Sequence, residues 1–169
     1  MGRLRRRSGT ATDLLKGAIA GAVATGVMDK LTTTLYERES QAARQKEDTA
    51  RHGQTAYDAA AEKAAGLLGK RLNSDDRHRL GNAVHWSLGI AAGAAYGVLR
   101  HRIPGLRRAG GAKFGTTFWA AIDEGLVSVL GLTPPPQAFP FQTHARGLVG
   151  HLAFGIVADR TLRVLDAVT

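Results

Sequence analysis

Uncharged stretches of helical length recur along the chain. Residues 80–99 contain no Asp, Glu, Lys or Arg, and arginines lie on both sides of this stretch. Twenty residues of α-helix extend about 30 Å, which matches the hydrocarbon core of a bilayer. The stretches at residues 17–28 and 147–158 reach that length only if the charged pairs that follow them belong to the same helices. The stretch at residues 125–145 is divided by three consecutive prolines.

This pattern predicts an all-α protein with four hydrophobic helices. We expect a four-helix transmembrane bundle whose spans lie at about residues 14–36, 80–99, 112–132 and 146–165. A soluble helical bundle is the competing interpretation, because alanine-rich stretches also form buried helices.

The remaining segments fit around these spans. Residues 1–13 are expected to form a basic cytoplasmic tail, and residues 14–169 a single membrane domain with an extramembrane insert at about residues 40–78. Alanines and leucines recur at helical spacing over residues 54–72, which predicts an amphipathic helix that lies on the membrane surface or caps the bundle. Residues 37–51 alternate in charge and extend the first helix or form a loose linker.

Composition alone would suggest a different class of protein. The chain is 44% hydrophobic and its mean hydropathy is −0.14, as in soluble proteins, and its net charge of +9 suggests nucleic-acid binding. The basic residues, however, are largely sorted by segment: they gather before residue 8, at residues 100–113 and near residue 160, whereas residues 133–145 contain no Lys or Arg. Residues 38–79 would lie outside although they are basic themselves, so this long segment of mixed charge departs from the pattern. The positive-inside rule then places both termini in the cytoplasm, with lipid rather than nucleic acid as the expected partner. A basic soluble or membrane-surface protein that binds nucleic acid is the alternative.

Glycines mark the expected packing surfaces of the helices. The chain has 21 glycines, only 6% aromatic residues and no cysteine, so disulfides and cysteine sites are excluded. Glycines four residues apart let helix backbones approach closely in lipid. These ladders contact another helix of the same chain or a second copy of it, which would form a homo-oligomer. The ladder residues are Gly17, Gly21, Gly89, Gly93 and Gly97.

Ionisable residues within the predicted spans are the candidate chemical groups. Because such groups are costly in lipid, they normally face the bundle interior and pair with one another. They are Asp29, His85, Asp123, Glu124 and His151.

Three interpretations of this polar intramembrane cluster compete. The side chains lock the bundle by hydrogen bonding, or they respond to protons, since histidine titrates near neutral pH. Alternatively, His85, Asp123 and His151 bind zinc or iron. No HxxxH or ExxH spacing favours a metal, so we expect no cofactor. Asp123 and Glu124 lie about 100° apart around a helix, so only one of them is expected to point fully inward.

The turn between the third and fourth helices is a further candidate feature. Three prolines end the third helix there and stiffen the chain. We expect His144 and Arg146, which flank this turn, to be solvated residues at the outer interface; a sharper hypothesis pairs Arg146 with a lipid phosphate or with Asp29. Phosphate-binding, dinucleotide and metalloprotease motifs are absent, so a non-enzymatic protein without catalytic residues is favoured. The candidate residues of the turn are Gly131, Thr133, Pro134, Pro135, His144 and Arg146.

Several motifs are similar to those of the YagU-like family of small bacterial inner-membrane proteins. They are the Gly-Leu-Thr-Pro-Pro run from Gly131, Gly-His-Leu from Gly150, the Gly-x-Ile-Ala-Gly run from Gly17, and His85 followed by Tyr96 and a basic loop.

This resemblance covers all four helices but not residues 38–73. It implies an integral protein of the bacterial inner membrane with no assigned reaction, and it implies that His85 and His151 are family features. The family has a histidine where this chain has Asp123, and Asp29 has no counterpart there. These departures weigh against a fixed metal site.

Overall fold

Helices make up most of the computed structural model, which describes residues 9–168. Over these residues no strand is present, so the predicted all-α class is confirmed. The long helices are α1 (Thr10–Glu37), α4 (Ser74–Arg102) and α7 (Phe141–Val168). The shorter elements are α2 (Gln41–Arg51), α3 (Ala56–Leu67), α5 (Ala112–Ala121), the π-helix η1 (Ile122–Leu126), α6 (Val127–Val129) and the 3-10 helix η2 (Pro136–Ala138). Residues 1–8 of the predicted basic tail lie outside the described residues.

Helices occupy all four predicted hydrophobic segments, with different bounds. The helix predicted at residues 80–99 begins at Ser74, because the side chain of Asn73 caps it by accepting a hydrogen bond from the Asp76 amide over 2.8 Å. The segment predicted at residues 112–132 ends at Val129, since Gly131 adopts a left-handed φ of 64° and terminates the helix. Within the described residues, no helix combines the length and the hydropathy needed to cross a membrane.

The insert contains the helix predicted at residues 54–72 and one further helix. The predicted helix is α3, with the shorter bounds Ala56–Leu67, and α2 precedes it. Ser40 caps α2 by accepting from the Ala43 amide, so residues 41–51 form a separate helix and neither extend α1 nor form a loose linker. Thr55 and Asp58 form a reciprocal capping box at the start of α3.

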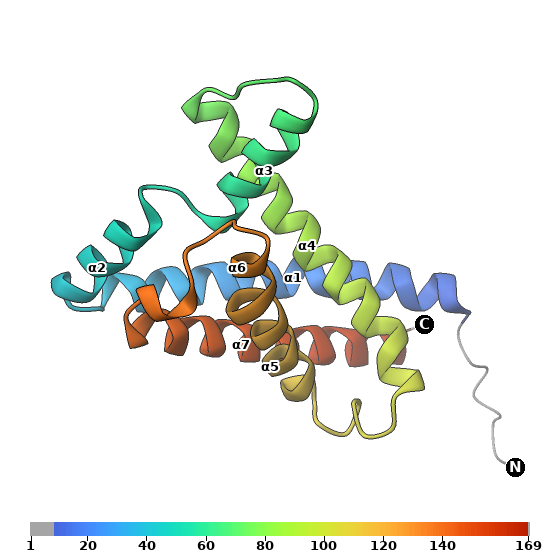
Figure 1. Cartoon of the computed structure of the whole chain (residues 1–169). Helices are drawn as coiled ribbons and strands as arrows, with labels where there is room; N and C mark the ends of the chain where they lie inside the picture. The colour runs from blue at the N-terminus through green and yellow to red at the C-terminus, as the bar shows by residue number, and fades with distance from the viewer. Residues whose placement is uncertain (1–8, 169) are drawn as a thin grey trace, which may run out of the picture.

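The helices pack as one antiparallel pair crossed by two further segments. In Figure 1, α1 and α7 lie side by side and run in opposite directions, α4 crosses α1, and α5 packs against α7. The start of α1 and the end of α7 lie at one end of this pair, together with the connection between α4 and α5. The short helix α2 and the Pro-rich turn lie toward the other end.

Glycine allows the backbones of α1 and α4 to touch. A Cβ atom added to Gly93 would lie 2.4 Å from the Cα of Gly21 and 2.5 Å from the carbonyl oxygen of Gly17. Gly89 lies against Thr25, and Gly97 lies against Asp13 and Gly17. The glycine ladders of these two helices therefore pack against each other within the chain. On the other side, Gly115 approaches the backbone of His151 in the same way.

The core is small and partly polar. Its largest fully buried side chains include Tyr96, Phe154 and Leu162, and most of the other buried apolar residues are alanines. The carboxylate of Asp159 is also completely buried; it accepts a hydrogen bond from the Tyr96 hydroxyl over 2.8 Å and one from Arg163 over 2.6 Å. Buried Arg100 pairs with Asp166 and lies 3.7 Å from Asp159. This network connects α4 to α7 near the end where both helices finish.

Candidate functional site

The π-helix η1 gives Asp123 and Glu124 separate partners on α7. A single π-helical turn inserts an extra residue into a helix and is frequently found at functional sites. The Asp123 carboxylate lies 3.6 Å from Nδ1 of His151, and the Glu124 carboxylate lies 2.7 Å from Nδ1 of His144. His144 and His151 are seven residues, or about two turns, apart on one face of α7. Both carboxylates thus reach histidines, whereas the sequence suggested that only one would point inward.

His85 pairs with a different carboxylate. Its Nε2 atom lies 2.7 Å from Oδ1 of Asp29, which joins α4 to α1, and its ring stacks on Tyr57 of α3 with the centroids 4.6 Å apart. His151, by contrast, is almost fully buried, and its Nδ1 atom lies 3.0 Å from the carbonyl oxygen of Gly147. The predicted cluster is therefore resolved into separate histidine–carboxylate pairs. Among the described residues, no three His, Asp or Glu side chains are arranged to hold a metal ion.

Sequence reasoning missed a fourth histidine–carboxylate pair. His78, in the second turn of α4, lies 3.2 Å from the buried carboxylate of Asp58 in α3. The capping box of Asp58 with Thr55 could be recognised in the sequence, but its contact with His78 depends on how α3 packs against α4.

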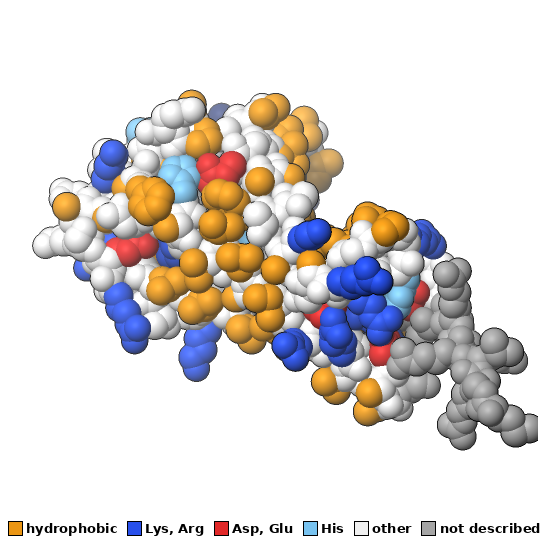
Figure 2. Space-filling model, turned by 90° about the horizontal axis from the view of Figure 1, so that it is seen from below, with side chains coloured by type: hydrophobic (Ala, Val, Ile, Leu, Met, Phe, Trp, Pro, Cys, Tyr) orange, Lys and Arg blue, Asp and Glu red, His pale blue; other side chains and the backbone are white. Residues whose placement is uncertain are grey.

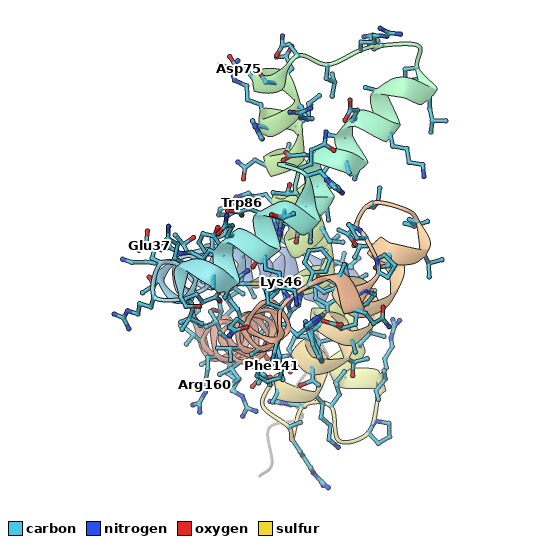
Figure 3. The ribbon with its side chains drawn as sticks, turned by 60° about the vertical axis from the view of Figure 1, so that its left-hand side comes forward. Glu37, Lys46, Asp75, Trp86, Phe141 and Arg160 are labelled. Atoms are coloured by element: carbon cyan, nitrogen blue, oxygen red, sulfur yellow. The ribbon has the colours of Figure 1, made fainter. Side chains whose placement is uncertain are left out.

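The partners of Arg146 differ from those predicted. Its guanidinium donates two hydrogen bonds to Glu47 over 2.6 and 2.7 Å, pairs with Glu39, and lies 4.9 Å from the centroid of the Tyr36 ring. The predicted pairing with Asp29 is wrong, because Asp29 is paired with His85. Arg146 instead fixes the start of α7 to α2 and to the end of α1. Figure 3 looks toward this end, where Lys46 marks α2 above Phe141, the first residue of α7.

Glu47 is a buried acid held in its charged form. Burial disfavours the carboxylate, but the hydrogen bonds from Arg146 and Thr143 and the positive charge of Arg51 outweigh burial, so the pKa of Glu47 lies below its ordinary value. Arg51 contacts Glu47 over 2.7 Å, and Thr143 donates to it over 2.7 Å. The sequence could not identify Glu47 as the buried acid, because charges alternate throughout residues 37–51 and its neighbours look the same.

The Pro-rich turn is joined to the same region by His144. Its Nε2 atom lies 3.1 Å from the carbonyl oxygen of Pro136, while Nδ1 contacts Glu124. Ser128 donates to the carbonyl oxygen of Pro134 over 3.1 Å and lies 3.3 Å from the hydroxyl of Thr133. The turn is thus bonded to the end of the third helical segment on one side and to α7 on the other.

A polar cavity of about 410 Å³ connects these pairs. It lies where the end of α2 meets α1, α3, α4, η1 and α7, and three of the four histidine–carboxylate pairs contribute to its wall. Its ionisable lining residues are Asp29, Arg51, Tyr57, Asp58, His78, His85, Asp123 and Arg146. A cavity of this size lies within the usual range of small-molecule sites, about 300–1,000 Å³.

Comparison with known proteins gives a family but no activity. The family model described as "Protein of unknown function (DUF1440)" matches residues 68–160. No curated protein matches the chain, and no solved structure does. The matched residues include α4, the π-helix and most of α7, and therefore His85, Asp123 and His151, but not Asp29. Since the match covers more than half of the chain, this protein belongs to the DUF1440 family, whose function is unknown.

Proposed function

We propose that this chain is an integral protein of the bacterial inner membrane whose histidine–carboxylate pairs respond to protons. In this arrangement the four long helical segments lie in the bilayer and both termini face the cytoplasm. The observation that carries the membrane part is the outward orientation of large aliphatic side chains along the middle of the helices.

The outer face of α1 illustrates this orientation. Leu15, Ile19, Val23 and Val27 recur every four residues and are 65, 47, 47 and 43% exposed. On α7, Val149 and Ile156 are also exposed. Figure 2 shows a face where hydrophobic side chains gather between groups of lysine and arginine side chains. Contiguous exposed apolar surface rimmed by polar groups is typical of membrane or partner contacts.

Several of the charged residues that lower the hydropathy of these helices are paired with other residues of the protein, whereas Lys30 and Arg160 are exposed. Asp29 pairs with His85, Lys16 lies 3.3 Å from Asp166, and Asp159 is completely buried. Because the paired charges face one another and the aliphatic groups face outward, the assembled bundle offers lipid a more apolar surface than any one helix predicts. This arrangement supports placing the helices in a bilayer.

The distribution of basic residues supports the proposed orientation. The connection between α4 and α5 contains Arg107 and Arg108, and it lies at the same end as the described termini. The Pro-rich turn, which has no Lys or Arg, lies toward the other end. The other end also carries α2, in which Arg44, Lys46 and Arg51 are mixed with Glu47 and Asp48. Because the positive-inside rule counts the Lys and Arg residues of short loops, the end with the α4–α5 connection is assigned to the cytoplasm.

His144 carries the proton-response part of the proposal. One ring nitrogen faces the Glu124 carboxylate and the other faces the Pro136 carbonyl, and both of these groups are acceptors. Both contacts are hydrogen bonds only when both nitrogens carry a proton, that is, in the imidazolium form. Loss of one proton therefore removes one of these two hydrogen bonds, either the one to Glu124 or the one to the Pro-rich turn.

Membrane fractionation tests the first part of the proposal. Membranes from cells that express the full chain are washed with high salt and then with alkaline carbonate. We expect the protein to remain in the pellet and to require detergent for release. Release by salt alone would overturn membrane insertion. It would support electrostatic binding to a polyanion such as nucleic acid.

Stability measured against pH tests the second part. Histidine side chains in general change charge between about pH 5 and 8. We expect the unfolding temperature of the detergent-solubilised protein to change between pH 5 and pH 7. Substitution of His144, His85 or His151 by glutamine should reduce that change, whereas His52→Gln, on the exposed end of α2, should not. Equal pH profiles for all four variants and the wild type would show that the pairs only lock the bundle.

A further inference from the structure

The polar cavity contains more negative charge than its own positive residues neutralise. Three carboxylates, those of Asp29, Asp58 and Asp123, belong to its wall, together with the guanidinium groups of Arg51 and Arg146. Neither guanidinium forms an ion pair with these three carboxylates, although the positive charge of Arg51 acts on Asp123. Both contact Glu47, and Arg146 contacts Glu39 as well.

The carboxylate of Asp58 has partners both at the start of its own helix and on α4. Its carboxylate accepts a hydrogen bond from the Thr55 amide over 3.1 Å and contacts His78 over 3.2 Å. The two remaining carboxylates, Asp29 and Asp123, have only histidines as ionic partners among the described residues. A neutral histidine leaves each of them without an ion pair.

Asp123 is the less satisfied of the two. The Nδ1 atom of His151 lies closer to the Gly147 carbonyl, at 3.0 Å, than to the Asp123 carboxylate, at 3.6 Å. No described residue donates a hydrogen bond to this carboxylate. About a third of each of the Asp29 and Asp123 side chains is exposed, and both residues line the cavity.

An aromatic side chain lies near both acids. Tyr57 lines the cavity together with Asp29 and Asp123. Burial raises the pKa of its hydroxyl, and the negative charges of Asp123 and Asp29 raise it further. The Tyr57 ring forms part of the cavity wall and presents an aromatic surface to a cation. Its hydroxyl has no hydrogen-bond partner among the described residues.

A second unpartnered polar group lies beside Asp123. The indole nitrogen of Trp119 is buried without a hydrogen-bond partner, in a smaller cavity that shares Tyr57 and Asp123 with the larger one. Gly147 keeps this region open, because an added Cβ atom would lie 3.0 Å from the Trp119 nitrogen and 3.4 Å from Asp123 Oδ2.

We propose that the cavity binds a short aliphatic diammonium ion, with one ammonium group at Asp29 and the other at Asp123. Two separate carboxylates match two cationic groups, and the Tyr57 ring and the methylene chain supply apolar contact between them. The inference rests on the proposed function, because the same histidine–carboxylate pairs take part in both. It assigns these pairs a ligand in addition to protons.

Calorimetric titration of the detergent-solubilised full chain at pH 8 with 1,4-diaminobutane tests this proposal. We expect saturable binding, and at least about tenfold weaker binding by Asp29→Asn and by Asp123→Asn, because each loses a charge-assisted hydrogen bond. Asp75→Asn is the matched control, since Asp75 is exposed in the first turn of α4, away from α1 and α7 (Figure 3). It should bind as the wild type does.

A ligand series on the wild-type protein keeps the proposal testable if the variants fold poorly. We expect 1-aminobutane to bind at least about tenfold more weakly than 1,4-diaminobutane, because it satisfies one carboxylate only. Equal affinity for the two amines, undetectable binding of the diamine, or unchanged binding by both cavity variants would overturn the proposal. Membrane fractionation does not depend on this ligand, so failure of the diammonium site and failure of the membrane proposal are distinguishable.

Discussion

The hydroxyl of Tyr96 donates a hydrogen bond to the carboxylate of Asp159 over 2.8 Å, and both side chains are completely buried. This contact joins α4 to α7 and belongs to the same network as Arg100 and Arg163. A buried carboxylate depends on such donors, because it cannot regain hydrogen bonds from water.

We therefore expect Tyr96→Phe to lower the free energy of unfolding by about 1.5–3 kcal/mol, the range for hydrogen bonds to charged groups. Urea or thermal unfolding in detergent measures this loss. Tyr36→Phe is the matched control, because Tyr36 donates to Asp48 at an exposed site, and its cost should stay below about 1 kcal/mol. Equal costs for the two variants would contradict a stabilising role for the buried contact.

Gly93→Ala should destabilise the protein by about 1–3 kcal/mol, the usual cost of overpacking. The added methyl group would collide with the backbone of Gly21 and Gly17, which cannot rotate away as a flexible side chain could, so α1 and α4 must separate. Gly66→Ala is the control, because a methyl group at that position of α3 meets no atom within 4 Å. It should be neutral or slightly stabilising, since alanine is the better helix former. A wild-type unfolding temperature for Gly93→Ala would contradict the close crossing.

Glu47→Gln should remove a pH-dependent contribution to stability. The pKa of Glu47 is lower in the folded protein than its ordinary value of about 4.5, so its contribution is fully present above that value. The contribution disappears as the pH falls through the lower pKa of the folded state. At neutral pH the loss of this buried charge should cost about 3 kcal/mol, because Arg146 and Arg51 lose their shared partner.

Unfolding curves of the wild type and Glu47→Gln, recorded from pH 7 down to pH 3, measure this effect. The stability difference between them should shrink below about pH 4.5. Glu62→Gln, at an exposed position of α3, should follow the wild-type curve throughout. A stability difference that does not change with pH would show that Glu47 does not act through its charge.

Val23→Asp tests the orientation of the aliphatic face of α1. If this face contacts lipid, a carboxylate there should cost about 2.5–3.5 kcal/mol on insertion. A smaller fraction of the variant should then resist alkaline extraction of membranes. Leu67→Asp is the control, because Leu67 is 85% exposed at the end of α3, in the insert outside the proposed spans. Identical extraction of both variants would contradict lipid contact at Val23.

Much of the helical framework follows from local sequence. The uncharged stretch after Arg79 predicts a helix, and Asn73 followed by two acids marks its start, because capping depends only on neighbouring residues. The spacing of Gly89 and Gly93 also identifies the face of α4 that packs closely. The separate helix α2 was missed because Ser40, its cap, lies in a strongly charged segment without a hydrophobic period.

The sequence by itself determined which residues carry charge within helices and which helix faces are lined by glycine and can pack backbone against backbone. Only the tertiary structure decided the partners. Asp29 meets His85 rather than Arg146, and Arg146 meets Glu39, which is 107 residues away. Such pairings depend on the crossing of the helices and on the extra residue of the π-helix, which turns Asp123 and Glu124 to different histidines. The spacing of residues along the chain reveals neither the helix crossing nor the π-helical turn, because both arise from packing between segments far apart in the chain.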